Sequence, residues 1–206
     1  MMACKIGSFV MGIAATNCYY LYDEEQKEAL VFDPPCNGEI IHKRLSEKGL
    51  SVCAILITHG HFDHISGIDG LKKTSGAPVY APAKEKELLC DPTLNLSDEG
   101  VCVSADHSVI DGEELSLGGF HLRVISTPGH TSGGCCYYFP DEKILISGDT
   151  LFAQSVGRTD LPTGSMSTLI ESIKEKLMVL EDDVTVYPGH GESTTIGEER
   201  KYNPFL

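Results

Sequence analysis

Residues 58–64, Thr-His-Gly-His-Phe-Asp-His, contain three histidines and one aspartate. The nearly unbroken apolar run 52–57 precedes them, which is typical of a strand that is covered on both faces. Ligand-type side chains gathered at the end of a buried strand are costly without a function, so we interpret the cluster as part of a metal centre. The spacing of His59 and His61 suits a loop or an extended segment, whose alternate side chains point the same way, rather than one face of a helix.

Further ligand-type residues follow predicted strands elsewhere in the chain, namely His130, Asp149 and His190. A lone histidine is more commonly a hydrogen-bonded structural or surface residue, which is how we interpret His42, His107 and His121. Together with the cluster, the strand-end residues give a candidate set of five histidines and two aspartates: His59, His61, Asp63, His64, His130, Asp149 and His190. Imidazole and carboxylate ligands without thiolate suit zinc, iron or manganese, and a carboxylate shared by Asp149 would serve two metal ions.

Asp33 lies at the end of another predicted strand, 28–32, and is followed by two prolines. Two interpretations of it stay open. A carboxylate in this position is a common turn residue, and it is equally suited to accept a hydrogen bond from a ligating histidine.

Length and charge limit the classes of function. A chain of 206 residues suits one domain, 1–206. The net charge of −14 argues against a nucleic-acid or an anionic-membrane partner. The N-terminus lacks the apolar run of a signal peptide, and no stretch approaches the ~20 apolar residues of a membrane span, so we predict a cytoplasmic protein. The eight cysteines include no C-x-x-C pair, and we expect all eight to be free thiols.

The chain alternates strand-like and helix-like segments in both halves, which predicts a layered α/β sandwich. An antiparallel β start is predicted at 5–10, 17–22 and 28–32, and a hairpin at 135–139 and 143–147, which would put Cys135 and Cys136 on opposite faces of one strand. Helices are predicted at 38–48 after a cap at Asn37, at 67–73, at 84–90, from Ser165 or Ser167 to about Leu180, and after Thr194 and Thr195.

Four short motifs resemble those of the metallo-β-lactamase superfamily, specifically its glyoxalase II-like (hydroxyacylglutathione hydrolase-like) branch. They are T-H-x-H-x-D-H at 58–64, G-H-T-x-G at 129–133, G-D-T-L-F at 148–152 and P-G-H-G at 188–191, in the order that the family has them. The resemblance implies an αβ/βα four-layer sandwich with the site at one edge of the two sheets. It also implies that one metal binds His59, His61 and His130, that a second binds Asp63, His64 and His190, and that Asp149 bridges the two.

The resemblance separates this chain from other branches. Asp149 stands where the main class of zinc β-lactamases carries cysteine, which argues against β-lactam hydrolysis. His61 stands where flavodiiron proteins carry glutamate, which argues against that redox branch. The chain also lacks the helical C-terminal extension of full-length glyoxalase II, so it resembles a compact form. The glutathione-contacting lysine stretch of the family is replaced here by residues 157–162, Gly-Arg-Thr-Asp-Leu-Pro, which leaves glutathione specificity open.

We therefore expect a hydrolase of small acyl thioesters such as S-lactoylglutathione, with two divalent metal ions and zinc favoured over iron or manganese. A hydroxide that bridges the metals would attack the carbonyl, and Asp63 would orient it as well as ligate. Arg158 is a candidate for binding a substrate carboxylate, and the competing interpretation is an ion pair with Asp160. Three further functions stay open: hydrolysis of esters or lactones, a persulfide dioxygenase with one iron on His59, His130 and Asp149, and a non-catalytic metal-binding module.

Overall fold

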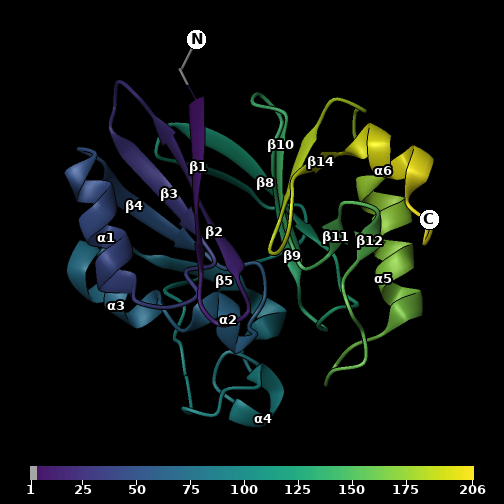
Figure 1. Ribbon diagram of the computed structural model, residues 1–206, viewed down its shortest axis with the longest axis horizontal. Helices are drawn as coiled ribbons and strands as arrows, with labels where there is room; N and C mark the ends of the chain where they lie inside the picture. Colours follow the sequence, from purple (N-terminus) through teal and green to yellow (C-terminus); the bar gives the residue numbers. More distant parts are fainter. Residues whose placement is uncertain (1–3) are drawn as a thin grey trace.

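The computed structural model describes residues 4–206 and has four layers: helices, a sheet, a second sheet, and helices (Figure 1). This architecture confirms the predicted α/β sandwich. Within the described residues, no helix is long and apolar enough to cross a membrane.

The first sheet begins antiparallel and continues parallel. Its strands, in spatial and sequence order, are β1 (Cys4–Met11), β2 (Thr16–Asp23), β3 (Glu28–Phe32), β4 (Ser51–Leu56), β5 (Val79–Pro82) and β6 (His107–Val109). The pairs β1–β2 and β2–β3 are antiparallel, as predicted, and β3–β4, β4–β5 and β5–β6 are parallel. Helices α1 (Gly38–Glu47) and α3 (Ile68–Ser75) pack together on the outer face, and α2 (Phe62–Ile65) follows β4.

The second sheet has β14 (Thr194–Thr195), β13 (Thr185–Pro188), β10 (Ile144–Gly148), β9 (Cys135–Phe139), β8 (Phe120–Ser126) and β7 (Glu114–Leu117), in that spatial order. The predicted hairpin is β9–β10, and β10 pairs with β13 in parallel. Helix α5 (Met166–Ser172) continues through a π-helical turn, η2 (Ile173–Leu177), and α6 (Ile196–Tyr202) closes the outer layer. The short strands β11 (Leu151–Phe152) and β12 (Ser155–Val156) pair with each other.

Three apolar cores hold the layers together. The middle core lies between the sheets and contains Phe32, Phe120 and Tyr137, while the outer cores lie under the helices. Cys135 faces the middle core and Cys136 faces the core under α5, which confirms their predicted opposite orientation. Parallel strands buried on both faces need apolar residues throughout, which explains the unbroken run before the histidine cluster.

Three helices begin where we predicted, but only two of them have the predicted side-chain cap. The side chains of Ser165 and Thr195 accept hydrogen bonds from the first turns of α5 and α6. Asn37 precedes α1 but has a left-handed backbone and no side-chain cap, so its side chain is not the helix signal we predicted. The helix predicted at 84–90 is only a short 3₁₀ turn, η1 (Ala83–Glu85), followed by turns.

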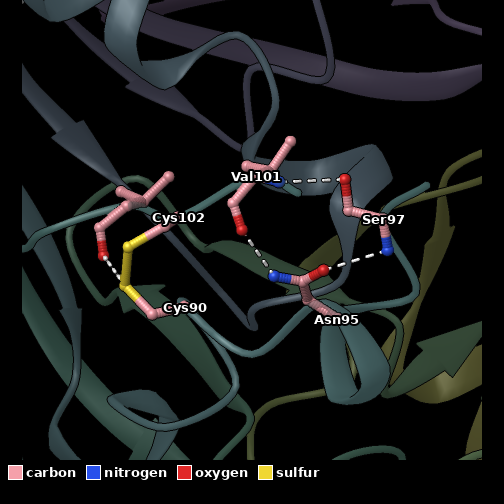
Figure 2. The surroundings of a disulfide bond; sticks show 6 residues. Cys90, Asn95, Ser97, Val101 and Cys102 are labelled. Atoms are coloured by element: carbon pink, nitrogen blue, oxygen red, sulfur yellow. Dashed lines mark hydrogen bonds between the residues drawn. A yellow bond between two sulfur atoms is a disulfide. The ribbon is translucent and has the colours of Figure 1, made fainter. Parts of the chain in front are cut away.

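The prediction that all eight cysteines are free thiols is wrong for two of them. Cys90 and Cys102 form a disulfide across a separation of 12 residues (Figure 2). The intervening segment contains α4 (Pro92–Asn95) and turns back on itself, because the buried Asn95 amide donates to the Val101 carbonyl and accepts from the Ser97 N–H. That reversal brings the two cysteines together, which cysteine spacing alone does not indicate. The other six cysteines are free.

Candidate metal centre

All seven candidate ligand residues come together at one edge of the sandwich, on the loops that leave β4, β8, β10 and β13. Their ligand atoms form three groups, and the atoms within each group lie within 4.8 Å of one another. His59 belongs to two of these groups, and so does His64. Loops at strand ends of a rigid sheet are where α/β proteins commonly assemble sites. The structure thus brings together every residue that the sequence selected as a ligand.

The first group consists of three buried histidines, His59, His61 and His130. The Nε2 atom of His130 lies 2.9 Å from Nδ1 of His61 and 3.2 Å from Nε2 of His59. His59 and His61 reach the same point because they alternate along an extended segment, with Gly60 between them. Three imidazole nitrogens therefore face a common position.

The second group consists of Asp63, His64 and His190. Asp63 Oδ2 lies 3.6 Å from Nε2 of His64 and 3.3 Å from Nε2 of His190. Helix α2 begins at Phe62, so the chain turns sharply after His61 and directs Asp63 and His64 to the other side of the loop. One loop thereby supplies ligand-type residues to both groups.

Asp149 lies between the two groups. Its Oδ1 is 3.4 Å from Nε2 of His64, and its Oδ2 is 3.5 Å from Nε2 of His190 and 3.6 Å from Nε2 of His130. A carboxylate with oxygens near nitrogens of both groups has the position that a bridging ligand needs.

Buried atoms without partners provide a test of whether these residues suit a metal. Among residues 4–206, buried side-chain atoms that find no hydrogen-bond partner include Nε2 of His64 and Oδ1 of Asp149, which lie 3.4 Å apart between the two groups. Buried polar groups are rarely left unpaired, because desolvation without a partner is unfavourable. The unsatisfied atoms gather where the donor set is imidazole and carboxylate, so these residues fit divalent metal ions.

Side chains orient the histidines of the 58–64 loop. Nδ1 of His64 donates to Oδ2 of Asp33 at 3.1 Å, and the Thr58 hydroxyl donates to the same oxygen at 2.6 Å. Nδ1 of His59 lies 3.1 Å from the Thr58 hydroxyl oxygen, which can accept from it. The buried Asp33 therefore orients His64 directly and His59 through Thr58, and in both rings the contact uses Nδ1 and leaves Nε2 to face the centre. This observation supports the second interpretation of Asp33, as an acceptor for a ligating histidine.

Main-chain groups orient the candidate ligands that come from the second half of the chain. Nδ1 of His130 donates to the Arg158 carbonyl oxygen at 2.7 Å. The loop of His190 is held by main-chain bonds, in which the Gly189 N–H donates to the Gly148 carbonyl and the Gly189 carbonyl accepts from the Asn17 N–H. A Cβ at position 189 would overlap Asp149 Oδ1 and His64 Cε1, so only glycine lets this loop approach the centre so closely.

The two groups differ in charge. Burial lowers the pKa of His59, His61 and His130, that of His61 to about 3, so these rings are neutral and suited to ligation. Hydrogen bonds to Asp149 and Asp63 raise the pKa of His190 to about 10. Burial opposes charge on His64, but Asp149 and Asp33 outweigh it and raise its pKa to about 9. The second group therefore loses protons when a metal binds.

Three positioning residues, Thr16, Asn17 and Glu85, were not predicted from the sequence. The Thr16 hydroxyl donates to Asp63 Oδ2 at 2.9 Å, and the Asn17 amide donates to the Pro188 and Gly191 carbonyls, each at 3.0 Å. Glu85 is fully buried and accepts from two loop N–H groups. Thr16 and Asn17 are polar residues at the start of a buried strand, which is a weak sequence signal for a positioning role. Glu85 lies in the charged run 84–87, which gave no signal for burial.

A cleft of about 420 Å³ opens onto the candidate centre. Its wall is apolar apart from Arg158 and ligand-type residues, and includes Ala14, Phe62, Leu96, Phe152 and Leu161. An adjoining cavity of about 490 Å³ shares Phe62, Asp63 and Leu96 with it. Leu96 belongs to the segment that the Cys90–Cys102 disulfide closes. A small molecule with apolar parts can therefore reach the ligand residues.

Arg158 lines this cleft but its guanidinium already has a partner. Nε and one terminal nitrogen each lie 2.8 Å from an oxygen of Asp160. The ion pair with Asp160 that the sequence allowed is thus present, and a role in binding substrate stays a prediction. The histidines that we did not select, His42, His107 and His121, lie on α1, β6 and β8 outside the centre.

A family model described as the metallo-beta-lactamase superfamily matches residues 11–190. A Bacillus subtilis protein named probable metallo-hydrolase YqgX is 42% identical over 201 residues, which cover 95% of this chain and 94% of that protein. A Haemophilus influenzae protein named hydroxyacylglutathione hydrolase GloC is 35% identical over 196 residues, 92% of each chain.

Solved structures agree with these relatives. BLEG-1, described as a B3 metallo-beta-lactamase, is similar with a TM-score of 0.93 and 41% identity, and the match covers 98% of this chain and 99% of that one. TTHA1623 in a di-iron-bound form is similar with a TM-score of 0.86 and 31% identity, over 97% of this chain and 100% of that one.

Proposed function

Because this chain belongs to the metallo-beta-lactamase superfamily, we propose that it is a metal-dependent hydrolase of small acyl thioesters, of the glyoxalase II-like branch. The observation that carries the proposal is the pair of ligand groups with Asp149 between them. The relative named hydroxyacylglutathione hydrolase supports the thioester class.

The residues would hold two divalent metal ions, with zinc as our first expectation and iron or manganese as the others. We assign His59, His61 and His130 to one ion, Asp63, His64 and His190 to the second, and Asp149 to both. Bound there, the ions would supply an activated water and a Lewis acid for the carbonyl oxygen. The similarity to a di-iron-bound structure supports two ions rather than one.

The chain's own residues would prepare the attack. The Thr16 hydroxyl fixes Oδ2 of Asp63, the oxygen that faces His64 and His190, and the carboxylate held in this way would orient the attacking water as well as ligate. The apolar side chains of Phe62, Leu96 and Phe152 exclude bulk water from the acyl group. A thiol with a pKa near ~8.5 leaves as thiolate without a strong general acid. We assign no nucleophilic serine or cysteine to the reaction.

Purified, metal-analysed protein tests the proposal against a panel of S-lactoylglutathione, simple thioesters, esters, lactones and a chromogenic β-lactam. We expect about two ions per chain and the highest kcat/KM on a thioester. Asp149→Ala should lose at least one ion and about 10³-fold or more in kcat, since it touches both groups. Undiminished turnover by Asp149→Ala would instead show that the metal centre does not carry the catalysis, and the centre would then be a non-catalytic metal-binding site.

Two outcomes of the same panel would replace the proposal. The similarity to BLEG-1 favours β-lactam hydrolysis as a second candidate, and β-lactam turnover above thioester turnover would establish it. With a persulfide added to the panel and oxygen uptake measured, one iron per chain and oxygen uptake on the persulfide would establish a dioxygenase that uses His59, His130 and Asp149.

A further inference from the structure

A buried glutamate joins the two loops that supply the first histidine group. Glu85 ends the 3₁₀ turn after β5 and is completely buried. Its Oε2 accepts from the Gly60 N–H at 2.8 Å, and its Oε1 accepts from the Gly133 N–H at 2.7 Å. One carboxylate therefore spans residues 73 positions apart in the chain, 133 minus 60, with one oxygen for each loop.

The two donors are close to ligand residues. Gly60 lies between His59 and His61, and Gly133 lies three residues after His130. A Cβ at Gly133 would overlap Glu85 Oε1, and a Cβ at Gly60 would overlap the Leu88 side chain and press on Glu85 Oε2. Both loops thus pack directly against the carboxylate, and a change in its position or hydrogen bonding moves the histidines.

Stability alone does not explain a carboxylate in this place. Burial raises the pKa of Glu85, and the main opposing influences within residues 4–206 are hydrogen bonds from the two loops rather than a lysine or arginine. Buried acidic groups are normally paired with a cation or replaced by an apolar residue, because desolvation is unfavourable. What the carboxylate provides in this place is a fixed separation between the two loops that it bonds.

We propose that Glu85 is a positioning residue that holds the His59–His61 loop and the His130 loop at the separation required for the first metal ion. The inference rests on the proposed function for the identity of that site as a metal site. The clamp itself rests only on the two hydrogen bonds and the burial. Glu85 makes no hydrogen bond to a ligand-type side chain, so its effect passes through the loop residues that it contacts, chiefly Gly60 and Gly133.

The test uses Glu85→Gln, which keeps the shape but turns an N–H donor toward one of the two loop N–H groups. A matched control is Glu199→Gln, because Glu199 is also buried and accepts from the Gln154 N–H, the Thr194 hydroxyl and the Asn203 amide. Both variants lose a buried carboxylate clamp. Of the two glutamates, Glu85 alone contacts the loops of the first histidine group.

The first readout is zinc binding to the apo proteins by competition with a chelator, together with the absorption spectrum of the cobalt-substituted forms. We expect Glu85→Gln to bind one of two ions about 10- to 100-fold more weakly, with the second unchanged and the cobalt spectrum altered. Glu199→Gln should bind both ions as wild type does. Equal affinities and equal spectra for Glu85→Gln and wild type would overturn the inference.

The second readout needs no metal. In apo protein, hydrogen exchange of the Gly60 or Gly133 amide should be about fivefold faster in Glu85→Gln than in wild type or Glu199→Gln. Unchanged exchange at both amides would refute the clamp even if the proposed function holds. If wild type binds no zinc but Glu85→Gln shows the faster exchange, the proposed function is refuted. The clamp is then confirmed as a purely structural device.

Discussion

The two halves of the candidate centre present their ligand residues in different ways. The first half supplies four of them from the single loop 58–64, and side chains hold that loop: Asp33 and Thr58 orient its histidines. The second half supplies His130, Asp149 and His190 from three loops. Main-chain groups orient His130 and hold the His190 loop against Gly148, beside side-chain contacts from Glu85 and Asn17. We therefore expect the first half to be sensitive to removal of side chains and the second half to added atoms near its backbone.

The largest expected effect comes from the second half. Gly189→Ala would push a methyl group into Asp149 and His64, so we expect kcat/KM to fall on the order of 10²- to 10³-fold and metal content to drop. Metal analysis and steady-state kinetics measure both.

The matched control is Gly76→Ala. Gly76 lies in the left-handed region, and nothing lies within 4 Å of its Cβ position. This control should cost about 1 kcal/mol in the free energy of unfolding and leave metal content unchanged. A Gly189→Ala protein that behaves like the control would break the distinction between the two halves.

In the first half, Asp33→Asn should have the next largest effect. Its amide would direct N–H groups at donors on His64 and Thr58, and metal affinity should fall about 10- to 100-fold, as chelator competition measures. Asp106→Asn provides the comparison, because Asp106 also accepts from a backbone N–H and from Lys72 but is exposed. Asp106→Asn should change neither metal affinity nor kcat. If both variants lost metal affinity, the loss would be a general effect of removing carboxylates.

Thr58→Val removes only the link between His59 and Asp33. His64 keeps its own bond to the carboxylate, so we expect metal affinity to fall about 10-fold, at the lower end of the range for such contacts. Isothermal titration with zinc measures the change. A loss as large as that of Asp33→Asn would show that both histidines depend on Thr58.

The smallest effect is expected for Arg158→Ala. The carbonyl of residue 158 orients His130 and remains in the variant, so metal content should not change. The guanidinium is exposed and paired with Asp160, so KM for a substrate with a carboxylate should rise only about 3- to 5-fold, with kcat unchanged. Kinetics on paired charged and neutral thioesters test this. Equal KM values would exclude Arg158 as a carboxylate-binding residue.

The sequence predicted the fold class and selected the candidate ligand residues because those depend on local patterns. Apolar runs predicted the buried strands, and motifs at their ends marked the residues that now lie together. Contacts that join distant segments were not predicted: Glu85 lies in a charged run that looks exposed, and the Cys90–Cys102 disulfide depends on a turn fixed by Asn95. For Asp33 the sequence leaves two interpretations open, since proximity to a proline does not tell where its carboxylate points.

The Asn17 amide bonds to Pro188 and Gly191 span 171 and 174 residues, nearly the whole chain. During synthesis, the histidine loop emerges long before β13 and its His190 loop exist. The centre can therefore be completed only when β13 docks beside β10, so a chain that has not yet reached β13 carries an unfinished site. After the site has closed, an ion that binds only the finished site stabilises the folded protein by mass action. The lifetime of the folded protein therefore depends on the supply of metal in its surroundings.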